Sequence, residues 1–118
     1  MSSGSKAVEI GNLFSALPAE QTNEEIFDQL LRVPGARIER IISTGQSTPE
    51  GEWYDQEDDE WVVLLAGAAR LQVEGEAEER ELDVGDWMLL PAHCRHRVTW
   101  TQIDPPTVWL AIHIAVAS

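Results

Sequence analysis

The chain has little cysteine and little positive charge, and each shortage excludes a class of protein. Its 118 residues include a single cysteine, Cys94, so no internal disulfide can form, and we expect a reducing, cytoplasmic location. Only 8 lysines and arginines stand against 21 aspartates and glutamates, which gives a net charge of −13. Because an acidic surface repels phosphate backbones and anionic lipids, we expect neither nucleic acid nor a membrane as a partner.

Long apolar runs and the common catalytic signatures are also missing. No segment approaches the roughly 18 apolar residues of a membrane span, and the N-terminus lacks a basic stretch followed by an apolar one. There is no Gly-x-Ser-x-Gly elbow, phosphate-binding loop or dinucleotide fingerprint. Hydrophobic residues nevertheless make up 43% of the chain, which is typical of a globular domain with one core.

Residues 1–35 are predicted to form an N-terminal arm that contains a short helix. Thr22 and Glu25 fit a capping box, in which the glutamate reaches back to the start of the helix. Four apolar residues then recur at helical spacing: Ile26, Phe27, Leu30 and Leu31. This pattern predicts a helix over about residues 23–32, ended by Pro34-Gly35, whose apolar stripe packs on the rest of the chain.

Residues 36–118 are predicted to form an all-β domain. About seven or eight short runs of β-forming residues are separated by turns at the spacing of a barrel or sandwich. Two of the expected strands, over residues 61–66 and 107–116, are apolar on both faces. One short helix cannot cover every outer face, so we expect a second copy of the chain to do so, in a homodimer.

Glu60 and His96 are the first candidates for a functional site. Because a strand alternates sides, Glu60 shares a face with Val62 and Leu64. By the same rule, His96 shares a face with Val98 and Trp100. A buried, unpaired carboxylate is costly, so the two inward side chains are expected to meet. They would share a metal ion or a polar ligand, or form a structural ion pair.

The residues around this pair resemble the two signature motifs of the cupin superfamily. The second motif is matched by Gly85, Pro91, His93 and His96, with His93 where a glycine is usual. Glu60, followed by six residues and Gly67, is similar to the end of the first motif. The resemblance covers roughly residues 36–114 and implies a cupin-like jelly-roll β-barrel, here preceded by the short N-terminal helix.

The resemblance also implies four metal ligands: two histidines one residue apart, a glutamate, and the histidine of the second motif. Glu60 and His96 match the last two. With four residues between the second of the paired histidines and Glu60, the pair would fall at Trp53 and Asp55. Of these two residues, only Asp55 could coordinate a metal. With His93 as a fourth ligand, the expected metal set is Glu60, His96, Asp55 and His93. Such a site would suit a divalent ion such as Mn, Fe, Zn or Ni.

Further side chains are expected to contact a small-molecule ligand: Trp53, Tyr54, Gln56 and Trp100. In a cupin, Trp53 and Trp100 would flank the pocket and could stack on a flat ligand. His113 would join the site only if its face, shared with Trp109, points inward.

Three functions remain open at this stage. The chain could bind a divalent metal, a small polar molecule or both in the barrel, without assigned chemistry. It could be a metal-dependent small-molecule enzyme of the isomerase, lyase or dioxygenase type. It could also be a metal-free dimer with a structural or ligand-sensing role.

Overall fold

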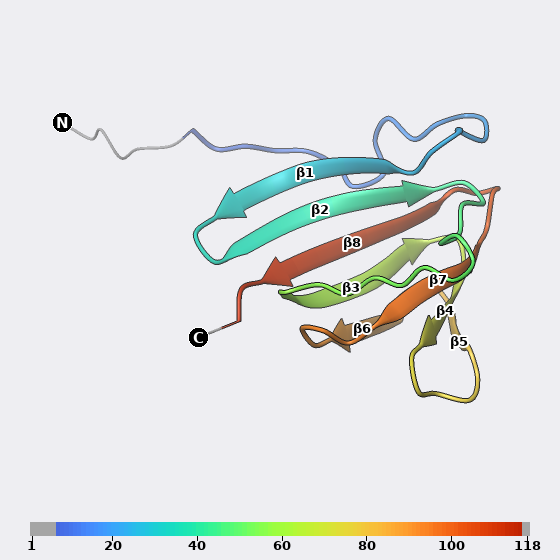
Figure 1. The fold of residues 1–118 in the computed structure, drawn as a ribbon. Coiled ribbons are helices and arrows are strands. Elements are labelled where there is room, and N and C mark those ends of the chain that lie inside the picture. The colour runs from blue at the N-terminus through green and yellow to red at the C-terminus, as the bar shows by residue number, and fades with distance from the viewer. Residues whose placement is uncertain (1–6, 117–118) are drawn as a thin grey trace.

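The computed structural model describes residues 7–116, whose regular structure consists of eight strands (Figure 1). Residues 1–6 and 117–118, at the ends of the expected arm and barrel, lie outside the described range. The strands are β1 (Ile26–Val33), β2 (Ala36–Ser43), β3 (Asp59–Ala66), β4 (Ala69–Val73), β5 (Arg80–Leu82), β6 (Trp87–Leu90), β7 (His96–Thr101) and β8 (Thr107–Ile114). The expectation of an all-β domain is therefore confirmed.

The strands form two antiparallel sheets that enclose the core. One sheet has the order β1-β2-β8-β3-β6 and the other the order β5-β4-β7. Figure 1 shows the long strands β1, β2 and β8 side by side in one layer. The prediction of a closed barrel is wrong, because the sheets keep separate edges. Within the described range, only one isolated bridge, between Tyr54 and His96, extends the smaller sheet beyond its named strands.

The prediction of a helix over residues 23–32 is also wrong, since most of this segment lies in β1 and none of it is helical. Pro34-Gly35 is the turn of a hairpin, and β1 pairs with β2 from Ile26 opposite Ile42 to Val33 opposite Ala36. The register shifts between Gln29 and Leu31, which adds one residue to β1 in the manner of a β-bulge. The extra residue, Leu30, lies next to Leu31. Together with the earlier pair Ile26-Phe27, these two leucines imitate the spacing of a helix.

The residues read as a capping box fasten the arm to the end of β2. The backbone N–H of Thr22 donates to Oγ1 of Thr44 at 2.9 Å. The hydroxyl of Ser43 donates to the carboxylate of Glu25. Further upstream, the guanidinium of Arg40 donates to the carbonyls of Leu13 and Ser15 at 3.1 and 2.6 Å. These bonds hold the arm against β2 and its C-terminal end.

The core lies between the inner faces of the two sheets. Its buried members are Val62, Leu64, Ala69, Leu71, Leu82, Leu90, Trp109 and Ala111. On β3 the alternation predicted from the sequence holds, with Val62 and Leu64 buried on the side of Glu60. Gly67, in the turn after β3, has a φ of +79°, and a Cβ there would lie 2.7 Å from the Cα of Thr107. Only glycine fits this close approach to β8.

Candidate functional site

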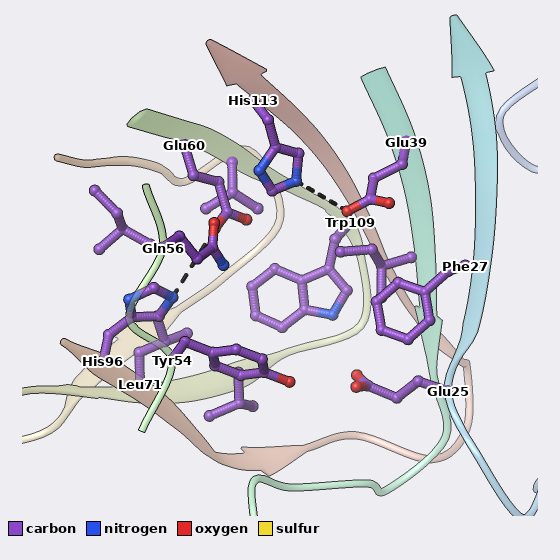
Figure 2. Close-up of a pocket in the computed structure, with 14 residues that line it drawn as sticks. Glu25, Phe27, Glu39, Tyr54, Gln56, Glu60, Leu71, His96, Trp109 and His113 are labelled. Atoms are coloured by element: carbon purple, nitrogen blue, oxygen red, sulfur yellow. Dashed lines mark hydrogen bonds and ion pairs between the residues drawn. The ribbon is translucent and has the colours of Figure 1, made fainter. Parts of the chain in front are cut away.

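A pocket opens between the inner faces of the sheets (Figure 2). Its volume is about 560 Å³, including the part open to solvent. The polar side chains that line it are Glu25, Glu39, Tyr54, Gln56, Glu60, His96 and His113. Its apolar walls include Phe27, Leu71 and Trp109. Such a cavity, apolar with a few convergent polar groups, is typical of small-molecule sites.

The structure brings Glu60 and His96 together in this pocket. Oε1 of Glu60 lies 3.9 Å from Nε2 of His96, and the two side chains are only 10% and 7% exposed. Nδ1 of His96 lies 2.9 Å from the carbonyl oxygen of Cys94, which can only accept a hydrogen bond. Nδ1 therefore carries a proton. In the neutral imidazole, Nε2 is then an acceptor, and it faces a carboxylate that is also an acceptor.

His113 also points into the pocket, on the inner face of β8 with Trp109. Its Nε2 lies 2.9 Å from Oε1 of Glu39, and its side chain is 4% exposed. Because the carboxylate accepts, Nε2 carries the proton and Nδ1 of the neutral ring is an acceptor. Nδ1 is buried and has no hydrogen-bond partner among the described residues. Glu60 and His113 are register partners on β3 and β8, and Figure 2 shows the free nitrogen on the side of Glu60.

Glu39 and Glu25 were missed by the sequence reasoning. Glu39 follows the alternation of β2, on the face of Ile41, and this pattern could have signalled it once the pairing with β8 was known. Glu25 looked like a capping residue, yet its carboxylate lies in the pocket beside Ser43. Burial raises the pKa of Glu25 above its usual 4.5, and the hydrogen bond from Ser43 only partly opposes this.

Tyr54 and Gln56, rather than Trp53 and Asp55, line the pocket next to Glu60. Tyr54 forms the bridge to His96, with its N–H donating to the carbonyl of His96 at 2.7 Å. The two rings stack with centroids 5.5 Å apart. In the cupin motif, two histidines separated by one residue come before the glutamate. Tyr54 and Gln56 have this separation, and they take the places of the two histidines when three residues, instead of four, are counted between the motif and Glu60.

Trp53 and Trp100 do not line the pocket. The ring of Trp53 lies under Arg95 and Arg97, at 5.6 and 5.9 Å from the guanidinium carbons. Trp100 is 40% exposed, with Arg70 over its ring at 5.3 Å. Its face is reversed because the pairing of β4 with β7 shifts between Arg70 and Leu71, leaving an extra residue in β7. Alternation counted from His96 therefore fails at Trp100.

Asp55 and His93 pair with each other on the surface. Nδ1 of His93 lies 2.9 Å from Oδ1 of Asp55, and the side chains are 67% and 49% exposed. The backbone N–H of His93 donates to the carbonyl of Gln56 at 2.7 Å. The φ of His93 is +63°, in the left-handed region that favours glycine. This explains why a glycine is usual at that place of the motif.

The described side chains do not fit a preformed metal centre. No group of three or more His, Cys, Asp or Glu side chains in residues 7–116 has the geometry to hold a metal ion. Of the four ligand places that the cupin motifs imply, two hold the strong ligands Glu60 and His96. Tyr54 and Gln56 offer a phenol and an amide. Burial, with nearby Glu25, raises the pKa of Tyr54, so the phenol stays protonated and is a poor ligand.

The fold is a jelly-roll β domain with a pocket between its sheets, and the comparisons identify its family. The cupin domain family matches residues 40–113, so the chain belongs to the cupin family. None of the curated proteins compared with the chain matches it significantly.

No helix in the described residues is long and apolar enough to cross a membrane.

Solved structures resemble the chain over nearly its whole length. A "putative mannose-6-phosphate isomerase" from Ralstonia eutropha is 49% identical, with a TM-score of 0.89 over 92% of this chain and 100% of that one. A cupin superfamily protein from Desulfitobacterium hafniense is 17% identical, with a TM-score of 0.72 over 93% and 94% of the two chains. A conserved Streptococcus pyogenes protein of unknown function is 16% identical, with a TM-score of 0.71 over 96% and 92%. The last two show the fold alone.

Proposed function

We propose that this cupin binds a small polar molecule between its sheets, through hydrogen bonds to Glu60, His96 and His113. The observation that carries the proposal is the buried Nδ1 of His113, which has no partner among the described residues. A buried polar atom without a hydrogen bond costs about 1–3 kcal/mol, so a ligand that bonds to it gains that energy. Nε2 of His96 and the carboxylate of Glu60 face the same pocket (Figure 2).

Saturation-transfer NMR with a set of small polar metabolites tests this proposal. Bound molecules should lose their signals in the Glu60→Gln and His113→Gln variants, which change hydrogen bonding with little change in volume. His93→Asn is the matched control, since it removes a histidine from the surface. Equal binding by the wild type and both pocket variants would contradict the proposal.

Catalysis on a sugar phosphate is the enzyme function that the name of the Ralstonia eutropha protein suggests. The described pocket lining contains no lysine or arginine. Phosphate groups in proteins are commonly held by such cations or by helix N-termini, and the described residues contain no helix. The described residues therefore offer no cationic site for the phosphate inside the pocket, and we do not extend that activity to this chain.

A divalent metal ion is a second candidate for the space between Glu60 and His96. The favouring observation is that a carboxylate and a neutral imidazole nitrogen, both metal ligands, face each other at 3.9 Å. Asp55 and His93, the other ligands expected from the sequence, would have to turn in from the surface. Elemental analysis of protein purified without an affinity tag tests this: stoichiometric metal that is lost in His96→Ala would support it, and none would exclude a tightly bound ion.

We also propose that the chain forms a homodimer through the outer face of the larger sheet. Trp61 and Trp87 stack there with centroids 5.9 Å apart, and Trp87 and Leu89 are 59% and 55% exposed. The register places Trp61 between Leu89 and Ile112, so the apolar surface is continuous across β6, β3 and β8. Light scattering should give twice the 13.2 kDa chain mass, and Leu89→Glu should halve it. A monomeric wild type would contradict the proposal.

A further inference from the structure

We infer that the pocket selects a small primary ammonium ion over neutral and anionic molecules of the same size. This inference rests on the proposed function, because it names the chemical class of the molecule that binds between the sheets. Three features of the pocket support it independently: its charge, the direction of its hydrogen-bonding groups and its aromatic walls.

The charge of the lining is one-sided. Three carboxylates, those of Glu25, Glu39 and Glu60, line the pocket, and no lysine or arginine does so in the described residues. Glu39 is paired with His113 and Glu25 accepts a bond from Ser43, whereas Glu60 lies 3.9 Å from its histidine, beyond hydrogen-bonding distance. A carboxylate that is mostly removed from water and lacks a close partner favours a cation beside it.

The hydrogen-bonding groups around this carboxylate are acceptors. Nε2 of His96 and Nδ1 of His113 both carry lone pairs in the neutral rings, because the opposite nitrogen of each ring donates to an oxygen. Together with Glu60 they present three acceptors to the same space (Figure 2). An ammonium group offers three donors and no acceptor, so it can satisfy all three. A carboxylate or phosphate offers only acceptors at neutral pH and would be repelled.

The walls of the pocket suit the rest of such a molecule. Tyr54, Trp109 and Phe27 line it, and the negative π faces of aromatic rings attract cations. The indole N–H of Trp109 is already used, since it donates to Oγ of Ser43 at 3.1 Å. The indole therefore contributes its apolar surface, and with Leu71 and Val98 it can contact a short hydrocarbon chain.

The test uses three molecules with one carbon skeleton: 3-methylbutylamine, 3-methylbutan-1-ol and 3-methylbutanoate. Each is titrated into ¹⁵N-labelled protein, and binding is followed by shifts of pocket amides and of the Trp109 indole, identified with Trp109→Phe. The amine should bind about tenfold or more tightly than the alcohol, the scale of one charge-assisted hydrogen bond, and the acid should not bind. Mannose and mannose 6-phosphate serve as further neutral and anionic probes.

Two isosteric variants isolate the role of charge. Glu60→Gln should reduce the affinity for the amine about tenfold more than the affinity for the alcohol, because only the amine loses a charge-assisted hydrogen bond. Glu25→Gln is a second variant in case the first does not fold, and the exposed neighbour Glu24→Gln is the control. Equal or tighter pocket binding of the alcohol, mannose or either anion would overturn this inference and leave the proposed function intact. No pocket shifts with any of the five probes would overturn the inference together with its basis.

Discussion

The three histidines of this chain each lie beside a carboxylate, but in two different settings. His93 and Asp55 meet on the surface, where both side chains are about half exposed or more. His96 with Glu60 and His113 with Glu39 meet in the pocket, where both histidines are buried. The surface pair has a distance of 2.9 Å, the same as that of His113 and Glu39. Distance alone therefore does not distinguish a buried pair from a surface pair.

Burial distinguishes the two settings, because water screens the surface pair and completes its hydrogen bonds. An exposed pair contributes about 0–1 kcal/mol to stability, whereas leaving a buried carboxylate without its hydrogen bond costs about 1–3 kcal/mol or more. A buried pair can also leave a polar atom without a hydrogen bond, as Nδ1 of His113 shows among the described residues. The sequence motif placed His93 in the candidate site, and the backbone placed it outside the pocket.

The largest effect is expected where a buried pair in direct contact is broken. His113→Ala leaves Glu39 without its partner and opens a cavity beside Trp109. The lost hydrogen bond to a carboxylate and the cavity together should cost about 3–5 kcal/mol in the free energy of unfolding, measured with urea. Asp55→Asn, which alters the surface pair, is the control. A loss below about 1 kcal/mol in His113→Ala would show that water reaches this pair in solution.

His96→Ala should have a smaller effect on stability. The carboxylate of Glu60 is 3.9 Å away, so no direct bond to it is lost. The variant loses the hydrogen bond to the Cys94 carbonyl and the stacking on Tyr54, and we expect a cost of about 1–3 kcal/mol. Urea unfolding of both histidine variants gives the order directly. If His96→Ala lowered the free energy of unfolding more than His113→Ala does, Glu60 and His96 would be in direct contact in solution.

Glu25 should show its burial through the pH dependence of stability. Its folded pKa is raised, so the fold prefers the protonated acid. This contribution is fully present below the unfolded pKa, near 4.5, and is lost as pH rises through the folded pKa. Glu25→Gln should therefore raise the melting temperature slightly at pH 7, and the gain should vanish at pH 4. The variant Glu24→Gln, at an exposed position, serves as control. A gain in melting temperature that persists at pH 4 would show that burial of the ionised Glu25 is not its cause.

The smallest effect is expected at the surface pair. Asparagine tolerates a positive φ better than most residues, so His93→Asn removes the imidazole without new backbone strain. We expect a change within about 0.5 kcal/mol in the free energy of unfolding and unchanged ligand binding. Loss of ligand binding in this variant would bring His93 back into the site.

The sequence predicted more of the pocket lining than of the N-terminal arm, because alternation is regular on β3 and interrupted on β1. Glu60 keeps strict alternation with Val62 and Leu64 on β3, so its inward direction followed from counting. The same rule failed at Trp100 and over β1, because register shifts insert one residue into β7 and β1. A bulge has no reliable sequence signal, and after it every side chain changes face.

By itself, the sequence determined the all-β class, the cupin motifs and the inward face of Glu60, because these follow from local spacing and turn residues. Only the tertiary structure decided that Tyr54 and Gln56 enter the pocket while Trp53 and Asp55 turn away, and that Glu39 pairs with His113. The pairing of β2 with β8 joins residues 74 positions apart. Their contact depends on strand register, which is set by the packing of both sheets and not by either segment alone.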